Sequence, residues 1–320
     1  MNALQMLRKA RFEVDALRTN NVKSDLWSDE EVLDALNTAM DIAGRIIRLA
    51  DSDLLSKTIR STGSSISFVT ETYAPSSIQI VADTSDYTLP PDCVRPVSIL
   101  PITSGMDGVR FRPAKTSQKF FMDNRVIPTT DLTTINNGEM TFYYTIFGSR
   151  TLRIVPTPKD TIDVEMVYQY RPSKLFVYTD GTVSVTKDST TVAGKSTAWS
   201  EYMRTPAELI VGSASLAKLD RPYPNVSTIG GDTSLTLAKA YTGATALDQA
   251  YCLAMVPTLP DEHHAWLAQM AAAIMLRKID LDMSDKAAAS LEKQLMNEIQ
   301  PEVSLRQAQE SLPVEPFELP

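Results

Sequence analysis

The spacing of apolar residues predicts helices at the two ends of the chain. From Trp27 onward, apolar residues recur at steps of three and four, the period of a helix that packs along one narrow seam. The stripe includes Leu33, Leu36, Met40, Ala43 and Ile47. Ser28 followed three residues later by Glu31 is a capping-box pattern, so we expect this helix to run from Ser28 to about Lys57. A shorter leading helix is expected over residues 4–17.

The pattern changes to strands between residues 61 and 175. Residues 66–72 and 77–82 are rich in β-branched side chains, which favour extended backbone. Residues 141–147, 152–155 and 164–170 are interpreted as consecutive strands of a β-meander. A short helix is expected in the middle of this region, over residues 115–125.

Residues 179–254 form a distinct segment rich in Thr, Ser, Val and Gly. Short alternating apolar runs are separated by turn residues, which predicts five to seven short strands. We interpret this segment as an inserted all-β domain, a small barrel or sandwich.

The chain returns to helical periodicity near its end. Residues 263–279 carry Ala, Leu and Met on all faces, which is typical of a helix buried by several partners. Trp266, Met270 and Ile274 are expected to join the seam formed by Leu33, Leu36, Met40 and Ile47. A second helix is expected with apolar residues at Leu291, Leu295 and Ile299.

The predicted fold class is therefore α+β. The N- and C-terminal helices pair into a helical bundle, from which the β-meander and the inserted domain extend. The expected domains are a core of residues 1–178 plus 255–320 and an inserted domain of residues 179–254. Residues 311–320 contain several prolines and are expected to form an extended tail.

Composition narrows the classes of function. The net charge is −8 and the pI is about 5.0, which argues against direct binding of nucleic-acid phosphates by clustered basic residues. No apolar run approaches the length needed to span a bilayer, and residues 1–11 lack a signal-peptide core. We therefore expect a protein made in a cytoplasm, without a membrane partner. Cys93 and Cys252 are isolated in the sequence and are expected to be buried free thiols.

Two short motifs resemble binding loops but are incomplete. Residues 194–197 read GKST, yet a phosphate-binding loop also requires glycine at position 189, where Ser189 stands. Residues 198–200 are expected to continue a β-like pattern rather than begin a helix. Residues 280–285 resemble the start of a calcium loop but lack its glycine, so we interpret them as a polar corner capped by Asp282 or Ser284.

The two histidines, His263 and His264, are adjacent on a predicted helix. Neighbours in sequence point to different faces of a helix, so the pair cannot share one metal ion. We expect packing or interface roles for both. No catalytic, metal or cofactor site is predicted, which favours an assembly protein over an enzyme such as a cell-wall hydrolase.

Four ordered motifs resemble those of the head-to-tail adaptor (connector) proteins in the neck of tailed bacteriophages. They read WSDEEVL at 27–33, DYTLPPD at 86–92, LRIVPTP at 152–158 and LPDEH at 259–263. Residues 179–254 are similar to a small β module common in phage structural proteins, through TVSVT at 182–186, STTV at 189–192, TAW at 197–199, DTSLTL at 232–237 and YTGAT at 241–245.

The resemblance implies a virion protein that forms a ring, expected to hold twelve copies, under the portal protein. The ring would continue the DNA channel without sequence-specific DNA binding, and would give a platform for the tail tube or nozzle and for tail fibres. The portal-docking residues implied in the tail are Leu312, Pro313, Phe317 and Leu319. Residues 281–320 carry a net charge of −5, which suits either a channel lining that repels DNA or a solvated face. Another tail, baseplate or fibre-attachment protein of the virion is the alternative.

Overall fold

The computed structural model describes residues 1–17, 26–50, 55–60, 78–102, 108–114, 140–148, 150–212 and 223–310. The chain divides into two compact units. The first consists of Met1–Leu54 together with Pro172–Pro320, and the second is Leu55–Arg171.

Helices from both ends of the chain belong to the first unit. They are α1 (Ala3–Leu17), α2 (Asp29–Leu49), the short 3₁₀ helix η4 (Asp261–His263), α5 (His264–Leu276) and α6 (Leu281–Glu310). The predicted start of α2 is confirmed, because the Ser28 hydroxyl accepts from the Glu31 backbone N–H and the Glu31 carboxylate accepts from the Ser28 backbone N–H. These bonds satisfy two backbone donors that the helix itself leaves without partners.

The predicted end of α2 is wrong. The helix ends at Leu49, and the predicted terminal residue Lys57 lies in strand β1 (Ser56–Arg60). All five residues of β1 pair with strand β8 (Ile162–Tyr170). This ladder, which uses the β-branched Thr58 and Ile59, outweighs the helical period of the sequence.

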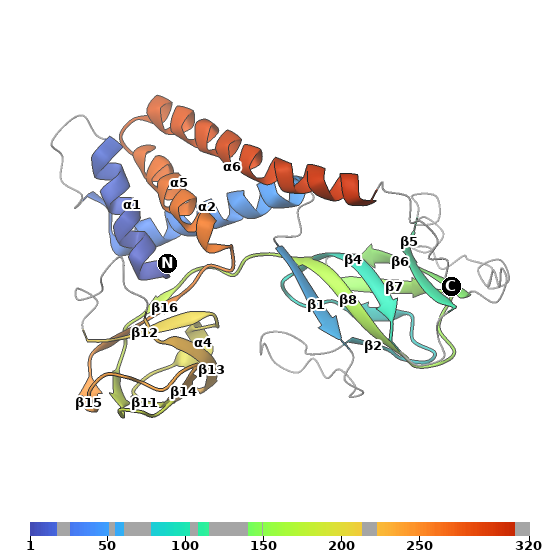
Figure 1. The fold of residues 1–320 in the computed structure, drawn as a ribbon, viewed down its shortest axis with the longest axis horizontal. Coiled ribbons are helices and arrows are strands. Elements are labelled where there is room, and N and C mark those ends of the chain that lie inside the picture. The colour runs from blue at the N-terminus through green and yellow to red at the C-terminus, as the bar shows by residue number, and fades with distance from the viewer. Residues whose placement is uncertain are drawn as a thin grey trace, which may run out of the picture. The chain divides into compact units, whose positions relative to one another are not determined.

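Helix α5 contacts each of the other long helices of the first unit. It packs against α1, α2 and α6, and Figure 1 shows it between α1 and α6. No residue of α5 is exposed; the fully buried ones include Leu267, Ala268, Met270, Ala271, Ala272 and Ala273. The small Ala side chains let neighbouring helices approach closely, and the helix is apolar around its whole circumference, as its sequence predicted.

The first unit also contains an antiparallel sheet of eight strands. Its members are β9 (Val177–Tyr178), β10 (Thr182–Val185), β11 (Thr191–Lys195), β12 (Ala207–Val211), β13 (Asn225–Gly231), β14 (Ser234–Leu237), β15 (Ala246–Gln249) and β16 (Tyr251–Met255). The strand order is β15-β10-β11-β14-β13-β12-β16-β9. Seven of these strands, β10 to β16, begin within residues 179–254, which agrees with the five to seven short strands predicted there.

Trp199 is the largest fully buried side chain of this sheet region. Its indole N–H donates to the Tyr251 hydroxyl over 2.8 Å. Gly194 leaves the space for it, since a Cβ at this position would lie 2.7 Å from the Trp199 ring. Trp199 also begins the one-turn helix α4 (Trp199–Tyr202), so the predicted β-like pattern over 198–200 is wrong.

The second unit contains two four-stranded sheets. One holds β1, β2 (Ile78–Ile80), β4 (Cys93–Pro101) and β8, with β8 pairing to the other three. The other has the order β3-β7-β6-β5, built from β3 (Asp86–Thr88), β5 (Val109–Pro113), β6 (Met140–Phe147) and β7 (Thr151–Val155).

The predicted meander is correct for its first pair of strands only. Strands β6 and β7 are antiparallel neighbours, but β8 joins the other sheet. Pro156 and Pro158 come just after β7. Because proline lacks a backbone N–H and cannot donate to a strand ladder, these residues disfavour a tight hairpin between β7 and β8. The predicted helix over 115–125 and the strand over 66–72 lie outside the described residues.

The fold class is mixed α and β with several sheets. The two compact units have boundaries at residues 54/55 and 171/172, which are not those of the predicted domains. The division into a core and an insertion over 179–254 stays a prediction. Cys93 and Cys252 are buried free thiols, as expected, and burial raises the pKa of each to about 12.

Truncation of Leu267 tests the packing of α5. Leu267→Ala removes a fully buried side chain, and we expect it to destabilise the helical unit by about 2–5 kcal/mol because a cavity is left among three helices. Leu281→Ala, at a position that is 51% exposed, is the matched control and is expected to change stability by less than about 0.5 kcal/mol. Denaturant unfolding followed by circular dichroism measures both; equal effects would contradict the packing.

Candidate functional site: a polar junction of α1, α5 and β12

The start of α1 carries a reciprocal cap. The Asn2 side-chain oxygen accepts from the Gln5 backbone N–H, and the Gln5 side-chain oxygen accepts from the Asn2 backbone N–H, each over 3.0 Å. Both side chains are buried. This arrangement satisfies two backbone donors at a helix start where the capping side chains are shielded from water.

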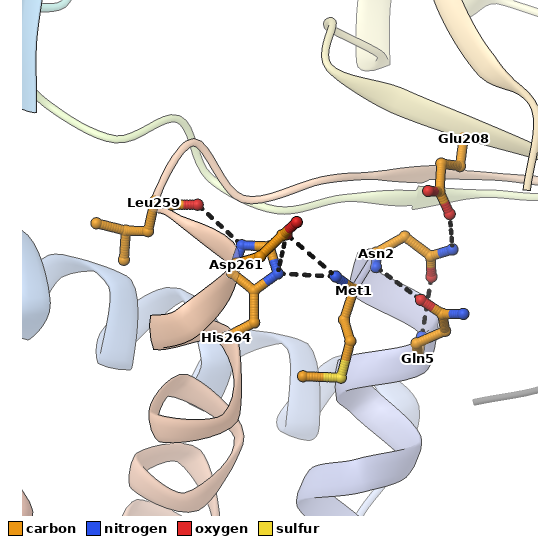
Figure 2. A network of polar contacts seen from close by, with 7 residues as sticks. All are labelled: Met1, Asn2, Gln5, Glu208, Leu259, Asp261 and His264. Atoms are coloured by element: carbon orange, nitrogen blue, oxygen red, sulfur yellow. Dashed lines mark hydrogen bonds and ion pairs between the residues drawn. The ribbon is translucent and has the colours of Figure 1, made fainter. Parts of the chain in front are cut away.

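The same Asn2 side chain connects α1 to the sheet. Its amide N–H donates to a Glu208 carboxylate oxygen over 2.6 Å, and Glu208 belongs to β12 (Figure 2). Burial raises the pKa of Glu208, and the Asn2 hydrogen bond acts against this rise. The hydrogen bond from Asn2 offsets part of the free-energy cost of removing the Glu208 carboxylate from water. Loss of this partner would leave that cost uncompensated and destabilise the fold.

His264 is the second centre of the junction. Its Nε2 lies 2.9 Å from the Leu259 carbonyl oxygen, and its Nδ1 lies 2.8 Å from the Met1 amino nitrogen (Figure 2). An ammonium group only donates, so Nδ1 must accept, and Nε2 must carry the proton that is donated to Leu259. The geometry therefore assigns the neutral tautomer to a ring that is 1% exposed.

The electrostatics of His264 agree with that assignment. Burial is the largest cause that lowers the pKa of His264, and the Met1 ammonium lowers it further. The Leu259 carbonyl and Asp261 act in the opposite direction. One Asp261 oxygen lies 3.2 Å from Nδ1 and 3.7 Å from the Met1 nitrogen, so this carboxylate faces both groups.

His263 occupies a different environment from its neighbour. The side chain is 7% exposed, and its two ring nitrogens each lie 3.7 Å from a carboxylate, Glu298 on the Nδ1 side and Glu262 on the Nε2 side. The prediction that the two histidines point in different directions is confirmed. His264 faces α1, whereas His263 faces α6.

The junction is built to hold segments together. Within the described ranges, no group of three or more His, Cys, Asp or Glu side chains is placed to hold a metal ion. Its contacts connect α1, β12 and the adjoining η4 and α5, three regions that are far apart in the sequence. What this site offers is therefore a set of polar connections between the helices and the eight-stranded sheet.

A second connection joins α2 to the strand region. The Asn37 side chain accepts from the Leu175 backbone N–H over 2.6 Å and donates to the Leu175 carbonyl over 3.2 Å. Near the same place Gly44 faces Pro172, whose ring would lie 3.2 Å from an added Cβ. Helix α2 therefore fixes the segment that leads into β9.

The residues predicted to form the helical seam are on the helices expected. Five of them are buried, namely Leu36, Met40, Ile47, Trp266 and Met270, while Leu33 and Ile274 are partly exposed. Their role as a functional seam stays a prediction. The predicted docking residues Leu312, Pro313, Phe317 and Leu319 lie outside the described residues.

Sequence reasoning missed most of the junction. An Asn followed three residues later by Gln before apolar residues is a readable capping signal, and Asn2 with Gln5 fits it. No local signal pairs Asn2 with Glu208, which is 206 positions away. The corner before α6 is capped by Asp280, which accepts from the Met283 backbone N–H over 2.9 Å, so the predicted caps Asp282 and Ser284 are wrong.

The comparison with protein families decides the class of the chain. A model of the SU10 adaptor protein family matches residues 1–194, which is more than half of the 320 residues. The chain belongs to the SU10 adaptor protein family. This confirms the resemblance to phage adaptors. No curated protein matches the chain.

Family membership indicates a structural adaptor protein of a phage virion, one that interacts with other phage structural proteins. The match to the SU10 adaptor family includes Met1, Asn2 and Gln5 of the junction and ends within β11. Glu208, Leu259, Asp261 and His264 lie beyond it. In the described part of this adaptor, no helix combines the length and apolar character needed to cross a membrane.

The His264 environment predicts how stability depends on pH. Because the pKa of His264 is lowered in the folded state, the unfolded chain binds more protons at this ring, and stability rises with pH. The contribution is complete above about pH 6.5, the usual value for histidine, and is lost as the pH falls through the lowered pKa. Unfolding free energies measured between pH 7.5 and 5.5 should therefore decrease, and His264→Gln should reduce the slope. An unchanged slope in the variant would contradict the assignment.

Proposed function

We propose that this SU10 adaptor family member forms a ring under the portal protein and connects the phage head to the tail. The ring is proposed to be a dodecamer that continues the DNA channel and presents a platform for the tail tube or nozzle and for tail fibres. The single observation that carries the proposal is the family match over residues 1–194. In the proposed ring, the four long helices form the side-by-side bundle and the eight-stranded sheet forms a small barrel or sandwich.

The packing of the helices supports this proposal. A ring subunit needs a rigid part that keeps its position between two neighbours, and α5 buries the N- and C-terminal helices against one another. The 30 residues of α6 extend over about 45 Å at the helical rise of 1.5 Å per residue. The exposed side chains of its residues 281–300, such as Asp285 and Lys293, leave this part of the helix available to other subunits.

The sequence that follows α6 is proposed to dock onto the portal. Residues 311–320 read SLPVEPFELP, in which prolines restrict the backbone before binding and so lower the entropy lost on docking. Leu312, Phe317 and Leu319 are the proposed apolar anchors, with Pro313 as the stiffening residue. The proposal places the portal contact within residues 311–320.

We propose that DNA passes through the channel of the ring without sequence-specific contacts to the protein. The chain has a net charge of −8, and twelve copies would multiply any acidic patch that faces the channel. Such a surface repels phosphate groups and keeps the DNA mobile. We propose a non-enzymatic role, because the chain belongs to the SU10 adaptor protein family.

Removal of the tail tests the docking proposal. A chain that ends at Glu310 should lose binding to purified portal protein by at least about tenfold, because the apolar anchors are absent. Electron microscopy of the mixture with portal should show rings for the full chain and none for the shortened chain. Circular dichroism of both chains should be alike apart from the lost residues.

A matched variant distinguishes the contribution of the apolar side chains to portal binding from that of the tail backbone. Phe317→Ala with Leu319→Ala keeps the length and the prolines, and is expected to weaken portal binding nearly as much as the deletion. Glu315→Gln with Glu318→Gln alters charge in the same segment and should leave most of the binding. Undiminished binding by the shortened chain would exclude the tail from docking, and the absence of any ring with portal would refute the proposed function.

A further inference from the structure

One face of the sheet β3-β7-β6-β5 is rich in arginine. Along β5, Phe111 points to the buried face, where its ring stacks on that of Phe142 from β6 with the centroids 5.2 Å apart. Successive side chains of a strand point to opposite faces, so Arg110 and Arg112 share the other face, and both are exposed. These two arginines are about 6.6 Å apart along the strand, at a rise of about 3.3 Å per residue.

The carboxylate on the same face is already bound by an arginine. Strand pairing places Arg153 of β7 and Asp86 of β3 on this face. The Arg153 guanidinium donates to both Asp86 oxygens, over 2.7 and 3.0 Å, and lies 4.6 Å from the centroid of the Phe147 ring. Among the described residues of this face, three guanidinium groups therefore occur with a single carboxylate. This arginine face, defined by Arg110, Arg112 and Arg153, suits an anionic partner.

Charge is divided unevenly between the two compact units. The second unit holds 12 Lys and Arg residues against 11 Asp and Glu residues, a net charge of +1. Of the 31 basic and 39 acidic residues of the chain, 19 and 28 remain for the first unit, whose net charge is therefore −9. The first unit of a second copy thus offers the anionic surface that the arginine face suits. The overall charge of −8 disfavours the approach of nucleic acid instead.

Helix α2 of the first unit carries a matching pair of carboxylates. Glu30 and Asp34 are four residues apart and both exposed, so they lie on one face of the helix. The carboxylates next to Glu30 in sequence form ion pairs inside the first unit. At 1.5 Å per residue, Glu30 and Asp34 are about 6.0 Å apart along the helix axis, close to the spacing of Arg110 and Arg112 on β5. A strand that lies along α2 can therefore form two ion pairs at once.

We propose that the arginine face of one copy binds the exposed side of α2 in a second copy. Arg110 and Arg112 pair with Glu30 and Asp34 of that copy. A planar guanidinium group donates two parallel hydrogen bonds to a carboxylate, so these pairs fix direction as well as charge. The two surfaces differ from one another, and a repeated contact of this heterologous kind closes into a ring when its rotation allows. The inference deepens the proposed function, since it supplies one interface of the ring and rests on that proposal for the closed form.

Reversal of the charges on each side tests the contact. One variant is Arg110→Glu with Arg112→Glu, and the other is Glu30→Lys with Asp34→Lys. Sedimentation velocity at low ionic strength measures self-association of the full chain, and electron microscopy shows rings formed with portal protein. Each variant alone should self-associate at least about tenfold more weakly and form no rings, because like charges meet at the interface. An equal mixture of the two variants should recover both properties, because each face then meets a helix of opposite charge.

The matched control changes the net charge by the same amount elsewhere. Lys187→Glu with Lys239→Glu alters two exposed residues in the connections of the eight-stranded sheet, and should leave self-association and ring formation unchanged. Recovery in the mixture requires contact between copies, since a contact within one copy would stay impaired.

Three results would overturn the proposal: an unaltered chain that does not self-associate, an arginine variant that associates normally, or a mixture that does not recover. Normal association of the arginine variant together with weaker binding of a DNA duplex would assign the face to nucleic acid instead. Recovery of self-association without rings on the portal would support the contact between copies and refute the proposed function alone.

Discussion

The burial of α5 is the interaction on which the first unit depends. A helix with apolar residues around its whole circumference is stable in water only when other elements cover it on several sides. Here the covering elements are α1 and α2 from the beginning of the chain and α6 from its end. One helix of 13 residues therefore brings together segments separated by more than 200 positions. The β-rich parts of the chain lie, in sequence, between the halves of this helical unit.

Polar contacts then determine how the helices and the eight-stranded sheet join. Apolar packing is tolerant of small shifts, whereas the bonds of Asn2, Glu208 and His264 have fixed partners and directions. Asn2 serves both as the cap of α1 and as the donor to Glu208, so the start of the helix and its contact with β12 depend on one side chain. For an adaptor, which interacts with other phage structural proteins, such a defined joint is a useful property.

Local patterns predicted the elements better than their partners. The capping box at Ser28, the apolar circumference of α5 and the strands β6 and β7 follow from residues close together in sequence, and the structure has them. The predictions are wrong where a segment far away in the sequence determines the secondary structure or the strand pairing. Strand β1 replaces the predicted end of a helix because β8 pairs with it, and β8 itself leaves the predicted meander for another sheet. The local sequence around Asn2 or Glu208 does not predict the hydrogen bond between them, because the two residues meet only in the completed fold.

The central claim is that the two ends of the chain fold as one unit around α5. Hydrogen exchange of a chain that ends at Met255, and so lacks α5 and α6, tests it most directly. The account predicts that amides of α1 and α2 lose their protection, because their apolar faces no longer have a partner, while strands of the second unit such as β8 keep theirs. Full protection of α1 and α2 in the shortened chain would contradict the account.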